Sequence, residues 1–299
     1  MEGASAQANG IELVYDGYGD PADPTVLMIM GLGTPRWGYD EELCRLIADR
    51  GFHVVRFDNR DIGDSTHLHD APAPDLEAAL GGDVSSASYR LEDMADDAAG
   101  LLDALRVESA HVVGVSMGGM IAQTLVIRHP ERVRSLISIM STVAPWVGPP
   151  REDILGILLA PPASDQPGHE RQVLDTWKAI RSPGFPFHED RVRELARRVW
   201  EAGYDPPGVA RQLIAIQASG DRTEALRRVD VPTVVIHGDC DPLVQHPGGV
   251  ATAEAIAGAE LDTITGMGHD LPVELFERFA ERIAELASRA DAEAVAAAR

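Results

Sequence analysis

The chain has 299 residues, of which 44% are hydrophobic and 25% charged, a balance that excludes collagen-like, disulfide-dense and wholly disordered proteins. Its 48 acidic and 26 basic residues give a formal net charge of −22, and such a surface repels nucleic acid and anionic lipid, so we expect neither as a partner. Two cysteines are too few for a secreted disulfide framework, and no secretion signal or membrane span is apparent, so we expect a cytoplasmic protein.

Short apolar runs and helical patterns alternate along the first half of the chain. We predict strands at residues 11–15, 25–30, 53–57, 111–115 and 135–139, because each run is apolar and ends at a glycine, an aspartate or a polar turn. Periodicity predicts helices at residues 39–50, 91–105 and 117–128, whereas residues 65–88 lack it and are interpreted as a long surface loop. This alternation predicts the α/β class, with a mostly parallel central sheet flanked by helices.

The character of the sequence changes after Ile139. Prolines punctuate short helical pieces from residue 145 to residue 207, and strand patterns return at residues 233–237 and 260–265. We therefore predict that residues 143–228 form a helical cap, inserted into a core made of residues 1–142 and 229–299. The tail after Leu286 is rich in Ala, Glu and Arg and is predicted to be a helix end that frays.

A G-x-S-x-G motif lies between the strand predicted at residues 111–115 and the helix predicted at residues 117–128. This strand–turn–helix context predicts that Ser116 is a nucleophile held in a strained backbone conformation, with Gly114 and Gly118 small because neighbouring segments approach closely. The N-terminus of the following helix would direct the N–H of Met117 at a developing oxyanion. The alternative is a glycine-rich turn with an incidental serine.

A second oxyanion donor is expected from the loop after an earlier strand. The run from Met28 to Gly33 fits, and we predict the backbone N–H of Leu32 as this donor, with its side chain lining the acyl pocket. The alternative is a tight glycine turn with no part in catalysis.

A serine nucleophile needs a base, and the base needs a carboxylate that orients it. In the turn after residues 233–237, we favour Asp241 over Asp239 as this acid, because Asp239 follows the turn glycine and is placed to bond local backbone. His269, preceded by glycines that let the chain turn tightly, is the predicted base, and His237 and His246 remain spare candidates. No cluster of His, Cys, Asp and Glu has the spacing of metal ligands, so we predict no catalytic metal.

With these residues in place, the chain resembles the α/β-hydrolase superfamily over nearly its whole length. Residues 58–65 are similar to the D-x-R-G-x-G-x-S turn of that family, although Asp61 stands where glycine is usual. Segments 19–24, 30–31, 111–114 and 266–269 look like those of the actinobacterial branch that includes aclacinomycin methylesterase. The resemblance implies ester hydrolysis, a helical cap over the pocket, and Ser116, Asp241 and His269 at the matching positions.

The predicted function is that of a serine carboxylesterase that cleaves a small to medium apolar ester through an acyl-enzyme on Ser116, without a cofactor. Trp146, Trp177 and Trp200 of the predicted cap are candidates to line the pocket, or alternatively pack the cap onto the core. The same triad is compatible with perhydrolase, lactone or carbon–carbon bond hydrolase chemistry, and a ligand-binding protein without turnover is a further alternative. The oligomeric state is not indicated by the sequence.

Overall fold

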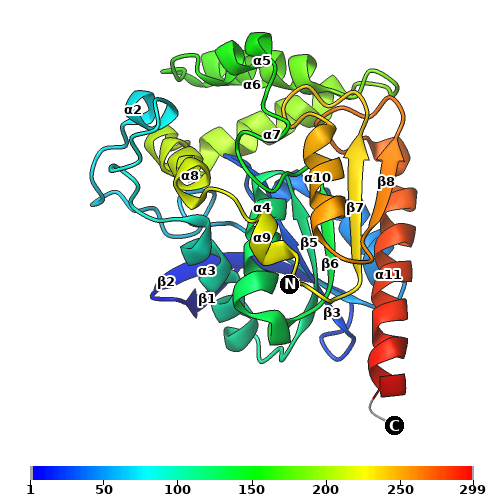
Figure 1. The fold of residues 1–299 in the computed structure, drawn as a ribbon. Coiled ribbons are helices and arrows are strands. Elements are labelled where there is room, and N and C mark those ends of the chain that lie inside the picture. Colours follow the sequence, from blue (N-terminus) through cyan, green and yellow to red (C-terminus); the bar gives the residue numbers. More distant parts are fainter. Residues whose placement is uncertain (1–2, 298–299) are drawn as a thin grey trace.

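A twisted sheet of eight strands organises residues 3–297, the part of the chain that the computed structural model describes (Figure 1). The strands lie in the order β1-β2-β4-β3-β5-β6-β7-β8. The pairs β1–β2 and β2–β4 are antiparallel, and all the other pairs are parallel. Their bounds are β1 Ala4–Ala8, β2 Ile11–Tyr18, β3 Thr25–Ile29, β4 His53–Phe57, β5 Ala110–Val115, β6 Val133–Ile139, β7 Thr233–Gly238 and β8 Glu260–Ile264.

Helices cover both faces of this sheet. One face packs against α1 (Glu41–Ala48) and α11 (Phe276–Ala297), and the other packs against α3 (Leu91–Ala104), α4 (Met117–Arg128) and α10 (Pro247–Ala255). Side chains alternate between the two faces of a strand, so Val112 and Val113 belong to two different apolar cores. Burial on both faces explains why the central strands read as continuous apolar runs in the sequence. Short 3₁₀ turns occur at η1 Arg36–Gly38, η2 Pro130–Arg132 and η3 Val273–Leu275.

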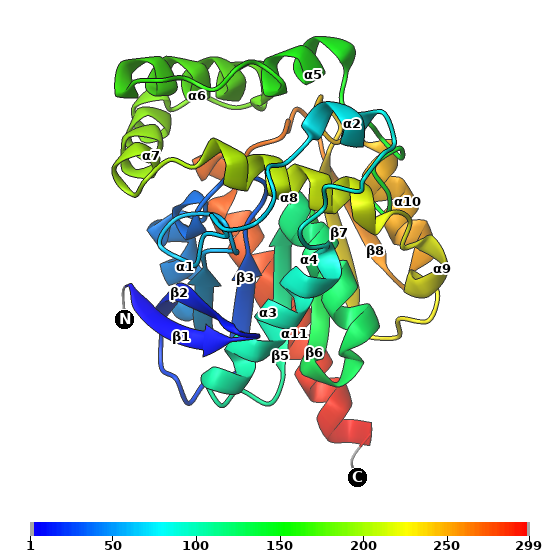
Figure 2. The same ribbon diagram turned by 90° about the vertical axis from the view of Figure 1, so that its left-hand side faces the viewer.

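The chain between β6 and β7 folds into a layer of helices above the carboxyl ends of the strands (Figure 2). These helices are α5 (Glu152–Leu158), α6 (Gln166–Ile180), α7 (Glu189–Glu201) and α8 (Pro206–Ser219), and the short α9 (Thr223–Leu226) follows on the flank of the sheet, beside α10 and α4. The prolines occupy positions that helices tolerate: Pro206 lies in the first turn of α8, where a backbone N–H would have no helical partner. Helix α8 runs closest to the sheet and contacts α3.

The predicted fold class is confirmed, with local differences. Strand β1 was not predicted, and residues 76–80 of the predicted surface loop form helix α2 (Leu76–Leu80), whose N-terminus is capped by the side chain of Asp75. Helix α11 continues through the predicted fraying tail to Ala297. Residues 1, 2, 298 and 299 of the predicted core lie outside the described part. None of the described helices is long and apolar enough to cross a membrane.

Candidate active site

The turn between β5 and α4 holds Ser116 in a conformation that L-residues rarely adopt. Its backbone has φ 56° and ψ −121°, which matches the strained elbow that the motif predicts. A Cβ on Gly114 would lie 2.2 Å from the carbonyl oxygen of Gly118, and one on Gly118 would lie 2.0 Å from that of Ile29. Both glycines are therefore required by close backbone approach, as the sequence predicts.

His269 lies within hydrogen-bonding distance of both Ser116 and Asp241. The Nε2 atom of His269 is 3.0 Å from the Ser116 Oγ, and its Nδ1 is 2.7 Å from the Asp241 Oδ2. The other carboxylate oxygen of Asp241 accepts the backbone N–H groups of Leu243 and Val244, each at 2.9 Å. Asp241 is buried and fully bonded, so it presents one oxygen to the imidazole in a fixed direction.

The competing candidates take other partners. Asp239 is exposed and accepts the Gly266 N–H at 2.7 Å, and this bond lowers the pKa of its carboxyl. It thus bonds the loop that carries His269 as well as Cys240 of its own turn. His237 is buried, which lowers its pKa, and its Nε2–H donates to the carbonyl of Val244 at 2.7 Å. His246 is half-buried and bonds the hydroxyl of Thr263.

The loop after β3 borders the serine. A Cβ on Gly31 would lie 3.1 Å from that of Ser116, so Leu32 follows directly on the residue that contacts the serine. Among residues 3–297, neither the N–H of Leu32 nor that of Met117 has a hydrogen-bond acceptor within the protein. The next N–H, that of Gly33, donates to the Gln212 side chain of α8 at 2.9 Å. Nothing in the sequence motif indicates Gln212, because this contact joins positions 179 residues apart.

The loop that carries His269 is hydrogen-bonded to residues 180–184, which connect α6 to α7. The His269 N–H donates to the carbonyl of Ile180 at 2.7 Å, and the Gly268 N–H donates to the Ser182 hydroxyl at 2.8 Å. Ser182 in turn donates to the side chain of Asp270 through its N–H, at 2.8 Å, and through its hydroxyl. Burial raises the pKa of Asp270 against these bonds. The candidate base is therefore supported from the inserted helices.

The two glycines before His269 were expected to let the chain turn tightly, and this reason holds for only one of them. Gly266 does turn the chain, with φ 78°. Gly268 does not have a positive φ, and a Cβ there would lie 2.4 Å from the carbonyl oxygen of Arg181. Its small size is required by the neighbouring residues 180–181 and not by a tight turn.

Asp61, the departure from the usual glycine, has φ 67°. This value explains why glycine is common at the position. The Asp61 carboxylate accepts the Leu68 N–H at 2.7 Å and receives two hydrogen bonds from Arg211 of α8, at 2.7 and 2.9 Å. These bonds outweigh the effect of burial and hold the pKa of Asp61 below its ordinary value. The strained residue is thus part of a buried ion pair with α8.

The three candidate pocket tryptophans lie in different environments. Trp200 of α7 packs against the rings of His169 and Tyr204, with centroids 5.7 and 5.9 Å away. Trp146 is exposed over 62% of its surface, and Trp177 is half-buried on α6. Trp200 thus packs within the inserted helices, while the roles of Trp146 and Trp177 in a pocket stay predictions.

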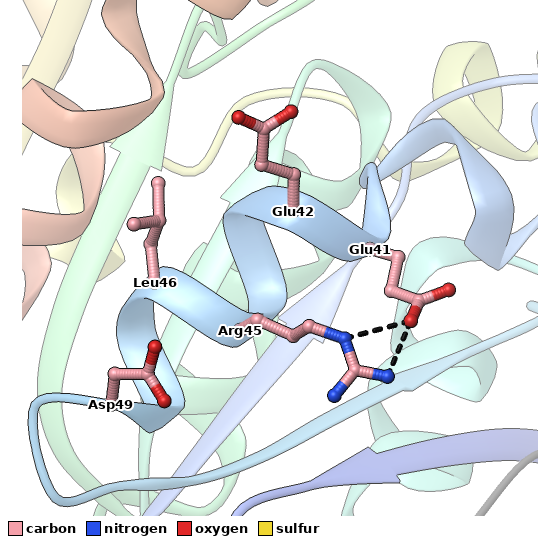
Figure 3. Close-up of a pocket in the computed structure, with 5 residues that line it drawn as sticks. All are labelled: Glu41, Glu42, Arg45, Leu46 and Asp49. Carbon is pink, nitrogen blue, oxygen red and sulfur yellow. Dashed lines mark hydrogen bonds and ion pairs between the residues drawn. The ribbon is translucent and has the colours of Figure 1, made fainter.

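A shallow hollow on the outer surface of α1 is a separate feature (Figure 3). It is lined by Glu41, Glu42, Arg45, Leu46 and Asp49, and the Arg45 guanidinium bonds the Glu41 carboxylate at 2.5 and 2.7 Å. No residue of the serine site lines it, and it offers no nucleophile. We therefore place the candidate chemistry at Ser116 and not in this hollow.

Comparison with known proteins gives the class to which this fold and site correspond. Residues 24–274 match the sequence profile of the alpha/beta hydrolase fold, and the chain belongs to this family of hydrolases. The resemblance expected from the sequence is confirmed.

Individual relatives have several named activities. The chain is 30% identical over 296 residues to the rhodomycin D methylesterase DauP of Streptomyces sp. (strain C5), covering 91% of this chain and 94% of that protein. It is 31% identical to the 2-hydroxymuconate semialdehyde hydrolase of Pseudomonas sp. (strain CF600), covering 71% of this chain and 73% of that protein. The crystal structure of the enol-lactonase from Burkholderia xenovorans LB400 superposes with a TM-score of 0.75 at 23% identity, covering 95% of this chain and all of that one.

Proposed function

We propose that the protein is a serine carboxylesterase that hydrolyses an apolar methyl ester or a similarly small ester through an acyl-enzyme on Ser116. The observation that carries this proposal is the line of hydrogen bonds from the Ser116 Oγ through the two nitrogens of His269 to the buried carboxylate of Asp241. A hydroxyl nucleophile, a base and an orienting acid in this order are the parts that acyl transfer needs. The likeness to a methylesterase over nearly the whole chain supports an ester as substrate.

In the proposed reaction, the Ser116 oxygen attacks the ester carbonyl while the Nε2 atom of His269 takes the hydroxyl proton. Asp241 stabilises the imidazolium that forms. The free N–H groups of Leu32 and Met117 are proposed to bind the oxyanion, and each such donor is typically worth about 3 kcal/mol. His269 then returns the proton to the leaving alcohol, and water, activated by the same histidine, hydrolyses the acyl-enzyme.

We further propose that residues 143–228 act as a cap that closes the site and selects the ester. The position of α5 to α8 above the carboxyl ends of the strands supports this role, because open α/β sheets bind ligands at that edge (Figure 2). The half-buried Trp177 is our first candidate for a pocket wall. The two free cysteines, Cys44 and Cys240, agree with action in the reducing cytoplasm.

The nucleophile is tested by fluorophosphonate labelling followed by intact-mass analysis. We expect one adduct on the wild type and none on Ser116→Ala. Ser141→Ala is the matched control, because Ser141 is a buried serine that lies against the same elbow. Absence of an adduct from folded wild-type protein would end the proposal that Ser116 is the nucleophile.

The reaction is tested by comparing substrates on one preparation. Hydrolysis of aromatic and aliphatic methyl esters is measured by pH-stat titration. We expect its rate to exceed the rates of lactone opening, carbon–carbon bond cleavage and peroxide-dependent bromination of monochlorodimedone. If one of these other reactions is faster by tenfold or more under matched conditions, that activity replaces the esterase proposal. If p-nitrophenyl acetate and decanoate are turned over equally by wild type and Trp177→Ala, the cap does not select the acyl group.

A further inference from the structure

Three potential metal ligands meet at the junction between the loop after β4 and helix α8. His67 and His69 come from the loop, and Asp205 is the residue directly before α8. One ligand atom from each residue lies within 4.8 Å of those of the other two. The two imidazole rings are nearly parallel, with centroids 5.4 Å apart. Figure 2 shows the loop after β4 passing beside α8.

The tautomer of His67 gives the reason to place a cation here. Its Nε2 atom is 3.1 Å from the carbonyl oxygen of Gly63, which accepts hydrogen bonds only, so Nε2 carries a proton. The Nδ1 atom then faces the Asp205 Oδ2 at 2.8 Å. In the neutral ring both of these atoms carry lone pairs, so at 2.8 Å a second proton joins them. A metal ion would replace that proton and move the two atoms apart to about 3.4 Å. Metal-binding histidines commonly donate their other N–H to a backbone carbonyl in this way.

We infer that His67, His69 and Asp205 form a binding site for a divalent transition metal, with Zn²⁺ the best match. Two imidazole nitrogens and one carboxylate oxygen are a frequent zinc ligand set, and water would complete four-coordination. Metal–ligand bonds of about 2.1 Å place tetrahedral ligand atoms about 3.4 Å apart. The His69 Nδ1 is 3.8 Å from the Asp205 Oδ2, and the exposed His69 side chain is free to close this difference.

The surroundings hold two of the ligands in place. Leu68 packs against the apolar core and donates its N–H to Asp61, which directs its two histidine neighbours away from the core. Asp205 and most of the His67 side chain are buried. The nearest positive charge is Arg211, at 3.5 Å from the Asp205 carboxylate, but its charge is already paired with Asp61 at 2.7 Å. The net charge of −22 raises the local concentration of cations around the protein.

A metal here would connect the loop after β4 to α8, and α8 touches the loop beside the serine. Val209 of α8 lies against Gly33, and the Gln212 side chain accepts the N–H of Gly33. The metal would thus stabilise the inserted helices at the point where they contact the candidate oxyanion loop. It would not take part in the serine reaction, because none of its ligands belongs to the Ser116 site.

The test uses the full-length protein without a histidine tag, stripped with EDTA and titrated with Co²⁺, whose visible absorption reports coordination. We expect one equivalent to bind with the intense bands of a four-coordinate ion, and Zn²⁺ to displace it. His69→Ala removes an exposed ligand and should weaken binding at least about tenfold. The matched control is His188→Ala, because His188 is also exposed and pairs with one carboxylate, that of Glu274 at 2.8 Å, and it should bind like the wild type.

Thermal unfolding is the second measurement, and it also tests the buried ligand, Asp205. Zn²⁺ should raise the Tm of the stripped wild type in a concentration-dependent manner, and His69→Ala and Asp205→Asn should need at least about tenfold more Zn²⁺ for the same rise. The inference is overturned if stripped wild type shows only the weak spectrum of hydrated Co²⁺, or if His69→Ala and wild type bind equally. In either case, a proton would be what joins His67 to Asp205.

Discussion

Replacing Asp61 by glycine should destabilise the protein, although glycine is usual at this position and Asp61 is strained. Glycine would remove the cost of a positive φ, about 1–2 kcal/mol for an L-residue. It would also leave Arg211, whose side chain is 3% exposed, without its bidentate partner, and breaking a buried pair in this way costs about 3–5 kcal/mol. The Asp205 carboxylate makes one contact with Arg211, at 3.5 Å, and does not replace the two shorter bonds to Asp61. The difference predicts a net loss of about 1–4 kcal/mol in the free energy of unfolding.

Urea denaturation followed by tryptophan fluorescence measures this loss. The matched control is Arg106→Gly, because Arg106 is exposed and has φ 59°, so glycine there should remove strain alone and gain about 1 kcal/mol. In an Arg211→Met background, Asp61→Gly should be neutral or stabilising, because no buried charge is left unpaired. If Asp61→Gly is as stable as the wild type while Arg106→Gly gains stability, the ion pair contributes nothing and our reasoning is wrong.

Ser182→Ala should lower kcat for the ester roughly ten- to hundredfold with little change in KM, because it loosens the loop of the candidate base; a change in KM alone would contradict this. Burial lowers the pKa of His111 to about 4, so the unfolded chain binds more protons below pH about 6.5 and stability falls as the pH drops towards 4. His111→Gln should flatten this part of the profile of urea midpoint against pH, and an unchanged profile would refute the assignment. Gly118→Ala places a Cβ 2.0 Å from the backbone of β3 and should cost roughly 3 kcal/mol or more, whereas Gly156→Ala on α5, with open space around it, should be neutral or stabilising by circular dichroism melts.

The elements that could be predicted from the sequence are those whose signal is local. The parallel strands are buried on both faces, so each appears as an apolar run, and α4 begins at the motif and ends at Arg128, before the His129–Pro130 step. Strand β1 has the sequence ASAQA, without a β-branched or aromatic residue, and it exists because it pairs with β2. Helix α2 has only five residues and depends on a capping aspartate and on contact with α8.

The same distinction applies to the candidate site. The serine elbow is encoded within a few residues, so its strain and its glycines could be predicted. The choice of Asp241 over Asp239 rested on loop spacing, and the geometry places Asp241 against the histidine. The contacts of Gln212, Ser182 and Asp205 join segments 86 to 179 residues apart, and no pattern within a single segment reveals them. The tertiary fold was needed to see them.

The hydrogen bonds between residues 180–184 and the histidine loop bear on how this fold can be diversified. Exchanging residues 143–228 for those of a relative would replace the proposed cap and, at the same time, the groups that hold the His269 and Gly268 backbone. A chimera that alters residues 180–184 should lose turnover on every ester, whereas one that keeps these five residues and exchanges the rest should change selectivity. Recombination and library design in this enzyme are therefore best begun on either side of that short connection.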